Sequence, residues 1–127
     1  MNTLSSCKLM AFIPTTNLNR AREFYKMVLG LRLVSQDEVA LMFEVAGTLL
    51  RVVNIPHPFA PSYTIAGWKV PNIGAVVDEL SQKGVEFERY AGFDQDKQGI
   101  WNSKNGSRVA WFKDPDGNIL SLTQFAN

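Results

Sequence analysis

The sequence predicts an α+β fold in which two βαβββ modules form a curved mixed sheet around a cup, and three observations lead to this prediction. Segments with strand-like alternation and segments with helical spacing follow one another in the same order in both halves of the chain. A segment that contains three prolines, residues 56–62, separates the halves. The helix caps and hairpin turns of the two halves also align, as expected for an internal repeat. We therefore expect one domain over residues 1–127, with modules at 7–55 and 63–125.

The first module is expected to contain a strand, a helix, a short strand and a hairpin, at residues 7–15, 16–30, 31–35 and 38–55. The helix is indicated by apolar residues that recur every three or four positions, and Asn17 and Gly30 are typical residues for its start and its end. The hairpin is expected to turn at Ala46-Gly47, between two segments rich in valine and leucine.

The second module repeats this order, with strands at 64–70, 85–90, 107–113 and 118–125 and a helix at 71–84. Asn72 is the expected helix cap, and the Asp-Pro-Asp-Gly sequence at 114–117 is a strong turn signal. The polar segment 91–106 is expected to be a loop, and Trp101 within it could close over a ligand as a lid.

The repeat also pairs individual positions of the two modules. The hairpin turn at 46–47 aligns with the turn at 116–117. This register places Arg51 and Ser121 at equivalent positions on the last strands of their modules.

Composition and charge exclude several classes of protein. With 46% hydrophobic and 20% charged residues, the 127-residue chain has the composition of a globular protein. A net charge of +1 without a basic cluster argues against nucleic-acid binding. The single cysteine, Cys7, rules out an intrachain disulfide and is expected to be a buried thiol. We see no signal sequence and no apolar run of membrane-spanning length, so we expect a cytoplasmic protein without a membrane partner.

Two motifs carry a resemblance to a known family. They are N-L-x-x-A-x-x-F-Y-x-x-V-L-G-L at residues 17–31 and W-F-K-D-P-D-G-N-I-L-S-L at residues 111–122. Both resemble motifs of the vicinal oxygen chelate superfamily, which includes glyoxalase I, bleomycin-resistance proteins and extradiol dioxygenases. The resemblance implies the glyoxalase-like fold and a homodimer, because members of this family often dimerise. It leaves the function open, since this fold hosts unrelated chemistries.

The resemblance also implies where a metal ion would be held, at one position on the first strand and one on the last strand of each module. In this chain these positions are Met10, Arg51, Ile65 and Ser121. Hard and borderline divalent ions prefer carboxylate oxygen or imidazole nitrogen, and none of the four side chains offers either. The guanidinium of Arg51 would also repel a cation. We therefore expect no metal ion and no other cofactor.

We expect instead a cup that binds a ligand, and Arg51 is its most informative candidate. A buried guanidinium needs either an anion or an internal ion pair, for which Glu44 and Glu38 are candidates. The hydroxyl of Ser121 could orient a ligand, or could simply fill space beside a larger neighbour. The full set of expected ligand-binding residues is Arg51, Ser121, Met10, Phe12, Ile65, Trp101 and Trp111.

Three functions remain open from the sequence. The first, which we favour, is a metal-independent protein that binds a small anionic or aromatic molecule, as bleomycin-resistance and other sequestering members do. The second is a lyase, an isomerase or a dioxygenase-type enzyme, with a displaced metal site or with acid–base chemistry at Glu44, His57 or Tyr90. The third is an accessory domain that acts through protein contacts. We assign no catalytic residue.

Overall fold

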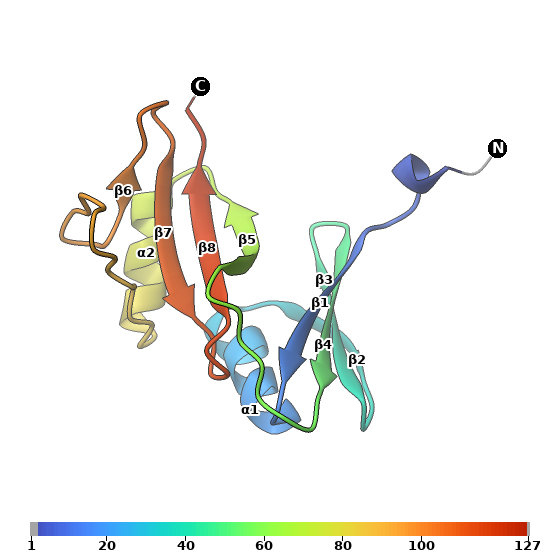
Figure 1. The fold of residues 1–127 in the computed structure, drawn as a ribbon. Helices are drawn as coiled ribbons and strands as arrows, with labels where there is room; N and C mark the ends of the chain where they lie inside the picture. Colours follow the sequence, from blue (N-terminus) through green and yellow to red (C-terminus); the bar gives the residue numbers. More distant parts are fainter. Residues whose placement is uncertain (1–2, 127) are drawn as a thin grey trace. The chain divides into compact units, whose positions relative to one another are not determined.

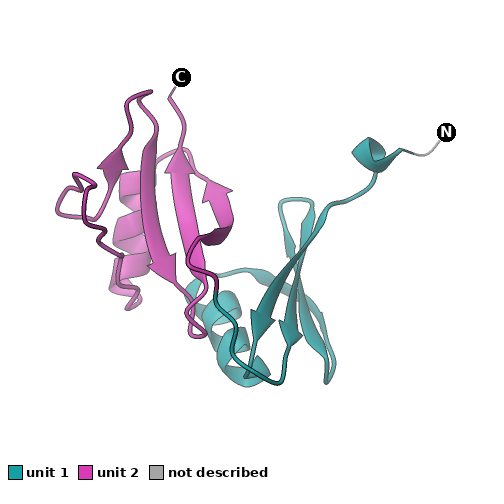
Figure 2. Ribbon diagram, in the orientation of Figure 1, with its two compact units in different colours: residues 1–60 teal, residues 61–127 magenta. Residues whose placement is uncertain are grey.

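The computed structural model describes residues 3–126, which form two units with one four-stranded sheet each (Figure 1). Unit 1 runs to Ala60, and unit 2 begins at Pro61 (Figure 2). In both sheets one outer strand is parallel to its neighbour, and the other pairs of strands are antiparallel. The α+β fold with two modules, predicted from the sequence, is therefore confirmed.

The sheet of unit 1 has the strand order β1-β4-β3-β2. Its strands are β1 (Met10–Thr15), β2 (Arg32–Gln36), β3 (Ala40–Val45) and β4 (Thr48–Asn54). A short 3-10 turn, η1 (Leu4–Ser6), precedes β1. The first strand therefore begins later than predicted, and Cys7, which lies outside the sheet, is exposed rather than buried.

A helical segment links β1 to β2. It consists of α1 (Leu18–Arg22) and the π-helical η2 (Glu23–Val28), which follows directly. As predicted, the side chain of Asn17 caps its start, because it accepts a hydrogen bond from the backbone N–H of Arg20 at 3.0 Å. Gly30, with a φ angle of +73°, follows its end, where the left-handed conformation suits glycine.

The core of unit 1 lies between this helical segment and one face of the sheet. Tyr25 is fully buried, and the centroid of its ring lies 6.0 Å from that of Phe43 on β3. Ile13, Leu41 and Val52 are also fully buried. Because side chains alternate along a strand, the residues between them face the other side of the sheet. That second face is not covered by the helical segment of unit 1.

The β3–β4 hairpin turns at the predicted residues. Ala46 and Gly47 have positive φ angles of +48° and +89°. Two successive left-handed residues, as in a type I′ turn, match the twist of the flanking strands.

The sheet of unit 2 has the strand order β5-β8-β7-β6. Its strands are β5 (Thr64–Lys69), β6 (Trp101–Asn102), β7 (Arg108–Lys113) and β8 (Ile119–Gln124). Helix α2 (Ile73–Gln82) packs on β7 and β8. As predicted, Asn72 caps this helix, and its side chain accepts a hydrogen bond from the backbone N–H of Ala75 at 3.1 Å.

The core of unit 2 lies between α2 and the face of the sheet that the helix covers. The buried side chains of the helix are Ile73, Val77 and Leu80. The buried side chains of β7 and β8 that alternate toward the helix are Ala110, Phe112, Leu120 and Leu122. None of the helices described between residues 3 and 126 is long and apolar enough to cross a membrane.

The strand predicted at residues 85–90 is wrong. One bridge, between Phe87 and Phe112, joins this segment to β7. The side-chain amide of Gln95 bonds to backbone groups that a neighbouring strand would otherwise take. It accepts a hydrogen bond from the N–H of Tyr90 at 2.8 Å and donates one to the carbonyl oxygen of Glu88 at 2.9 Å.

The fourth strand of this sheet is β6, which lies within the predicted loop 91–106. Trp101 on β6 is paired with Val109 on β7 at the edge of the sheet. The hypothesis that Trp101 belongs to a lid is therefore corrected, because this residue is part of the sheet.

Candidate functional site

The face of the second sheet that α2 leaves uncovered carries three residues aligned across neighbouring strands. Trp111 on β7 is paired with Ser121 on β8, and Ser121 is paired with Gly67 on β5. Their neighbours along the strands, such as Phe112 and Leu120, are buried toward α2. Trp111 and Ser121 therefore point to the opposite face, which we call the open face of unit 2.

The side chain of Ser121 fits the space above its glycine neighbour. A Cβ atom placed on Gly67 would lie 3.0 Å from the carbonyl oxygen of Ser121 and would clash with its hydroxyl. Ser121 is buried, with 9% of its surface exposed. Two roles were considered for Ser121 from the sequence, filling space and orienting a ligand. This geometry supports the first role, and contact with a ligand stays a prediction.

Ile65, expected at a position equivalent to a metal ligand, lies at an irregularity of the sheet. The pairing of β5 with β8 shifts between Thr64 and Ala66, so Ile65 is not paired with a residue of β8. Gly67 is the residue opposite Ser121. A shift of this kind adds one residue to a strand and cannot be read from sequence spacing.

Four aromatic side chains form a cluster on the open face of unit 2 and the loop beside it: Tyr90, Phe93, Trp101 and Trp111. Phe93 stacks on Trp111, with ring centroids 5.4 Å apart and ring planes inclined by 28°. The ring centroid of Trp101 lies 4.8 Å from that of Phe93 and 6.0 Å from that of Trp111. Tyr90 meets Trp111 edge to face at 5.4 Å. Each ring thus contacts at least two others, in geometries that aromatic pairs prefer.

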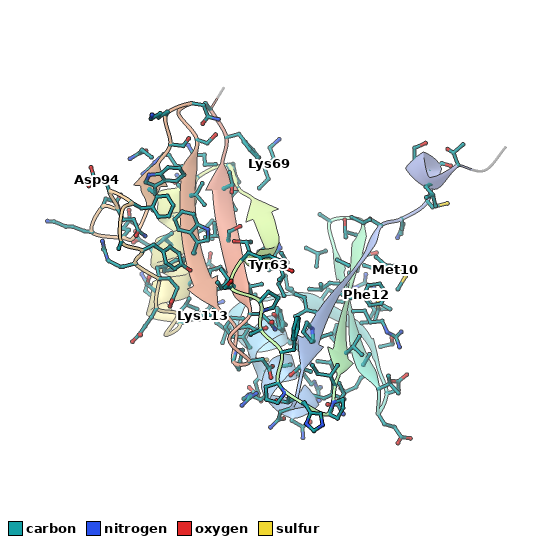
Figure 3. The ribbon with its side chains drawn as sticks, viewed as in Figure 1. Met10, Phe12, Tyr63, Lys69, Asp94 and Lys113 are labelled. Atoms are coloured by element: carbon teal, nitrogen blue, oxygen red, sulfur yellow. The ribbon has the colours of Figure 1, made fainter. Side chains whose placement is uncertain are left out.

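A cavity of about 350 Å³ lies beside this cluster, within unit 2. The aromatic side chains that line it are Tyr63, Tyr90, Phe93 and Trp111. Ser62 and Thr64 add hydroxyl groups to the lining. Tyr63 lies immediately before β5 (Figure 3). Apolar walls with a few polar groups are typical of a site for a small molecule.

Tyr90 lines this cavity, and its hydroxyl is a buried polar group. It is closed off from solvent and forms no hydrogen bond within residues 3–126. Burial, and after it the negative charge of Glu88, raise the pKa of Tyr90 above its ordinary value. The phenol therefore stays protonated at neutral pH and can donate a hydrogen bond.

Arg51 occupies in unit 1 the position that Ser121 occupies in unit 2. It is paired with Phe12 on β1 and with Met42 on β3, on the face that the helical segment leaves uncovered. Met10 and Phe12 extend from β1 on the same face (Figure 3). They are 39% and 60% exposed. We call this face the open face of unit 1.

The ion pair between Arg51 and Glu44, considered from the sequence, does not form. The carboxylate of Glu44 contacts Arg32 at 2.9 Å and Lys8 at 3.5 Å. Among the residues that the structure describes, Arg51 forms no ion pair.

The charge of Arg51 instead reaches Asp37 in the β2–β3 turn. The backbone N–H groups of Val39 and Ala40 donate hydrogen bonds to this carboxylate at 2.8 and 2.9 Å. These bonds, and to a smaller extent the charge of Arg51, lower the pKa of Asp37 below its ordinary value.

The residues at the four positions implied for a metal site do not fit a hard or borderline divalent ion. Met10 offers a thioether, Arg51 a cation, Ile65 an alkyl group and Ser121 a neutral hydroxyl. Between residues 3 and 126, no three side chains of His, Cys, Asp or Glu are grouped so that they could hold one ion. His57 is exposed in the segment that follows β4.

The structure brings some of the expected ligand-binding residues together within each unit. Trp101 and Trp111 meet in the aromatic cluster, and Ser121 lies beside Trp111. Sequence reasoning missed Tyr63 and Phe93. For Phe93 a signal was present, because a large aromatic ring in a polar loop is expected to pack on another surface.

This arrangement of two repeated βαβββ units, with a helix on one face of each sheet, defines a glyoxalase-like protein. The sequence model of the Glyoxalase/Bleomycin resistance protein/Dioxygenase superfamily matches residues 8–122. The chain therefore belongs to this superfamily, as its two motifs predicted. No curated protein matches the sequence.

Solved structures show the same fold over nearly the whole chain. A superfamily member from Sphaerobacter thermophilus has a TM-score of 0.75 and 20% identity, over 96% of this chain and 99% of that chain. A glyoxalase/bleomycin resistance protein/dioxygenase from Alicyclobacillus acidocaldarius has a TM-score of 0.74 and 16% identity, over 100% of this chain and 96% of that chain. Lactoylglutathione lyase from Agrobacterium tumefaciens has a TM-score of 0.72 and 16% identity, over 94% of this chain and 93% of that chain. At these identities the likeness concerns the fold.

Proposed function

We propose that this protein binds a small, planar and largely apolar molecule without a resident metal ion. The observation that carries the proposal is the cluster of Tyr90, Phe93, Trp101 and Trp111 beside a cavity of about 350 Å³. A tryptophan face that is flanked by further rings offers stacking energy beyond the burial of apolar area. The cavity volume is at the lower end of the range of small-molecule sites.

Independence from a metal ion is supported by the chemistry of the side chains. The four positions implied for ligands provide neither carboxylate nor imidazole. The acid–base alternative has weaker support, because Glu44 is engaged by two cations and His57 is exposed outside the cavity. Tyr90 does line the cavity, but its raised pKa keeps the phenol protonated at neutral pH, so it is not a base there.

Arg51 is a proposed contact for an anionic group on the open face of unit 1. Its support is the missing ion pair among the described residues, next to the apolar side chains of Phe12 and Met42. If Arg51 binds anions, benzoate should raise the melting temperature of the parent protein more than that of Arg51→Leu and Arg51→Ala. Equal shifts in all three proteins would remove Arg51 from the site.

The main proposal is tested by titrating the protein with naphthalene while following the indole N–H signals of its three tryptophans by NMR. Trp101 and Trp111 belong to the cluster. Trp68 is paired with Leu122 on the face that α2 covers, so it serves as an internal control. We expect naphthalene to shift the signals of Trp101 and Trp111 and to leave that of Trp68 unchanged.

Two variants sharpen this test. Trp111→Ala removes the face on which a ring would stack and is expected to weaken naphthalene binding about tenfold, which corresponds to about 1.4 kcal/mol. Trp68→Phe, the matched control, should bind naphthalene like the parent. The proposal fails if naphthalene at its solubility limit shifts neither cluster signal, or if Trp111→Ala binds as tightly as the parent.

A further inference from the structure

We infer that Tyr90 is the hydrogen-bond donor that selects the ligand of this cavity, and that Phe93 occupies the stacking place which the ligand ring takes. The inference rests on the proposed function and narrows its ligand class. The ligand is a planar ring system that carries a neutral hydrogen-bond acceptor at its edge.

The hydroxyl of Tyr90 is a buried donor that has no hydrogen-bond partner within residues 3–126. The large majority of buried polar side-chain atoms in proteins have a hydrogen-bond partner, so a buried donor without one requires an explanation. Tyr90 lines the cavity, and its ring lies 6.3 Å from that of Phe93 and 5.4 Å from that of Trp111. These aromatic neighbours offer the hydroxyl no conventional acceptor. Once the hydroxyl is uncovered, an acceptor atom on a molecule in the cavity would satisfy it.

The surroundings of the hydroxyl limit the charge that the acceptor can carry. The negative charge of Glu88 acts on the Tyr90 hydroxyl, and Lys113 balances part of this charge through an ion pair at 3.5 Å. The hydroxyl is also buried beside aromatic rings, where an unpaired carboxylate would be costly to desolvate. These surroundings favour a ring nitrogen or a carbonyl oxygen over a carboxylate.

The loop that carries Phe93 has many hydrogen bonds at its base and few at its tip. Its base is fixed, because the side-chain amide of Gln95 bonds to backbone groups on both sides of the loop. Arg89 also donates to three loop carbonyl oxygens, at 2.6, 2.9 and 3.4 Å. The tip, residues 91–94, is held differently. Within the described part of the chain, its one hydrogen bond runs from the N–H of Phe93 to the carbonyl oxygen of Tyr90 at 3.2 Å.

The tip can therefore move while the base stays in place. Phe93 is 42% exposed although it stacks on Trp111, and Gly92 before it has a φ angle of +91°, a conformation that suits glycine. When the Phe93 ring leaves the face of Trp111, a flat ligand ring can take the same stacking position. Displacement also removes one of the rings that lie against Tyr90.

The inference is tested with two probes of matched size and shape, naphthalene and quinoline, which differ by one ring nitrogen that accepts a hydrogen bond. The variant Tyr90→Phe keeps the ring and removes the donor. We expect it to weaken quinoline binding about threefold to tenfold, the worth of one hydrogen bond, and to change naphthalene binding less than twofold. The signals of Trp101 and Trp111 report binding, and that of Trp68 reports that the fold is intact.

A second variant, Phe93→Ala, tests the displacement. It should strengthen the binding of both probes, because the face of Trp111 no longer has to be vacated. Phe125→Ala is the matched control, since Phe125 is 58% exposed and lies outside the cluster, and it should leave both affinities unchanged.

The possible outcomes separate this inference from the proposed function. If Tyr90→Phe loses the same affinity for both probes, or loses affinity for neither, the donor role of Tyr90 is overturned. The proposed function is still upheld in that case, provided that the parent protein binds naphthalene. Weaker binding of both probes by Phe93→Ala would show that Phe93 is a fixed wall and overturn the displacement. Failure of the parent to bind naphthalene would overturn both proposals.

Discussion

At the scale of single residues, the small side chain of Ser121 is explained by the residue beside it in the sheet. Gly67 and Ser121 are paired on parallel strands, and the Ser121 hydroxyl lies where a side chain on residue 67 would have to be. The two residues therefore form a matched pair, in which glycine at one position fixes the space that is open to the other. This packing explains Ser121 without any ligand.

This pairing makes a prediction about stability. Gly67→Ala should lower the free energy of unfolding by about 1–3 kcal/mol, the usual cost of overpacking. In the double variant with Ser121→Ala the cost should be smaller than the sum of the single costs, since the clashing hydroxyl is gone. Urea unfolding measures the stability of the single variants and of the double variant. Gly74→Ala in α2 is the control. Its added Cβ would meet no atom closer than 3.7 Å, so it should raise stability by about 0.5–1 kcal/mol.

If Gly67→Ala lowers the free energy of unfolding no more than a neutral surface substitution does, the matched pair is contradicted. Strict additivity with Ser121→Ala would contradict it as well, because independent residues do not share a clash.

The burial of Tyr90 predicts how the free energy of unfolding depends on pH. Burial raises its pKa in the folded protein, so the folded state holds its phenolic proton more tightly than the unfolded state does. The stability that this proton contributes is complete below the ordinary tyrosine pKa of about 10 and is lost as the pH rises toward the folded value. The free energy of unfolding should therefore fall more steeply between about pH 9 and pH 12 in the parent than in Tyr90→Phe.

Urea unfolding across this pH range checks the difference in slope. Tyr63→Phe is the control, because Tyr63 is 67% exposed and its removal should leave the slope of the parent unchanged. Parallel curves for the parent and Tyr90→Phe would show that the Tyr90 hydroxyl is not desolvated.

At the scale of elements, the sequence predicted those features whose cause is local. Asn17 and Asn72 each cap a helix through a backbone N–H three residues further on. Ala46 and Gly47 form the hairpin turn by their own conformation. In these cases the residues that carry the signal also make the interaction, so a short stretch of sequence is sufficient.

The elements that could not be predicted depend on contacts with other segments. Residues 85–90 alternate like a strand, yet the side-chain amide of Gln95 bonds the carbonyl oxygen of Glu88 and the N–H of Tyr90. Nothing in the alternation of residues 85–90 reveals a side chain that folds back from outside the segment. The shift of pairing at Ile65 is hidden for the same reason, since register is set between strands.

The candidate site was predictable to the same extent. Trp111 and Ser121 lie on the strands before and after a strong turn, so strand alternation made their common face foreseeable. The cavity was not, because Tyr63 and Phe93 reach it from segments without regular structure.

At the scale of the whole molecule, the two units share one plan, in which helical residues of the unit cover one face of its sheet and leave the other face uncovered. On the open face of unit 1, Phe12 is 60% exposed and lies next to Arg51, and apolar exposure of this kind is common where a protein meets a partner. The homodimer expected from the family resemblance stays a prediction. Sedimentation velocity tests it, and a monomer at high micromolar concentration would contradict it.

Membership of a superfamily with metal-dependent members makes metal addition the most direct test at this scale. The positions implied for ligands hold Met10, Arg51, Ile65 and Ser121, so we expect no stoichiometric binding of zinc, nickel, manganese or ferrous ions in calorimetric titrations. An ion bound to the folded state would also stabilise it, so neither added ion nor a chelator should change the melting temperature. A single exposed histidine can bind zinc or nickel weakly, and His57→Gln is the variant that removes this background. Tight binding with one ion per chain that survives His57→Gln would contradict the metal-independent function. The donors would then have to come from residues other than the four implied positions.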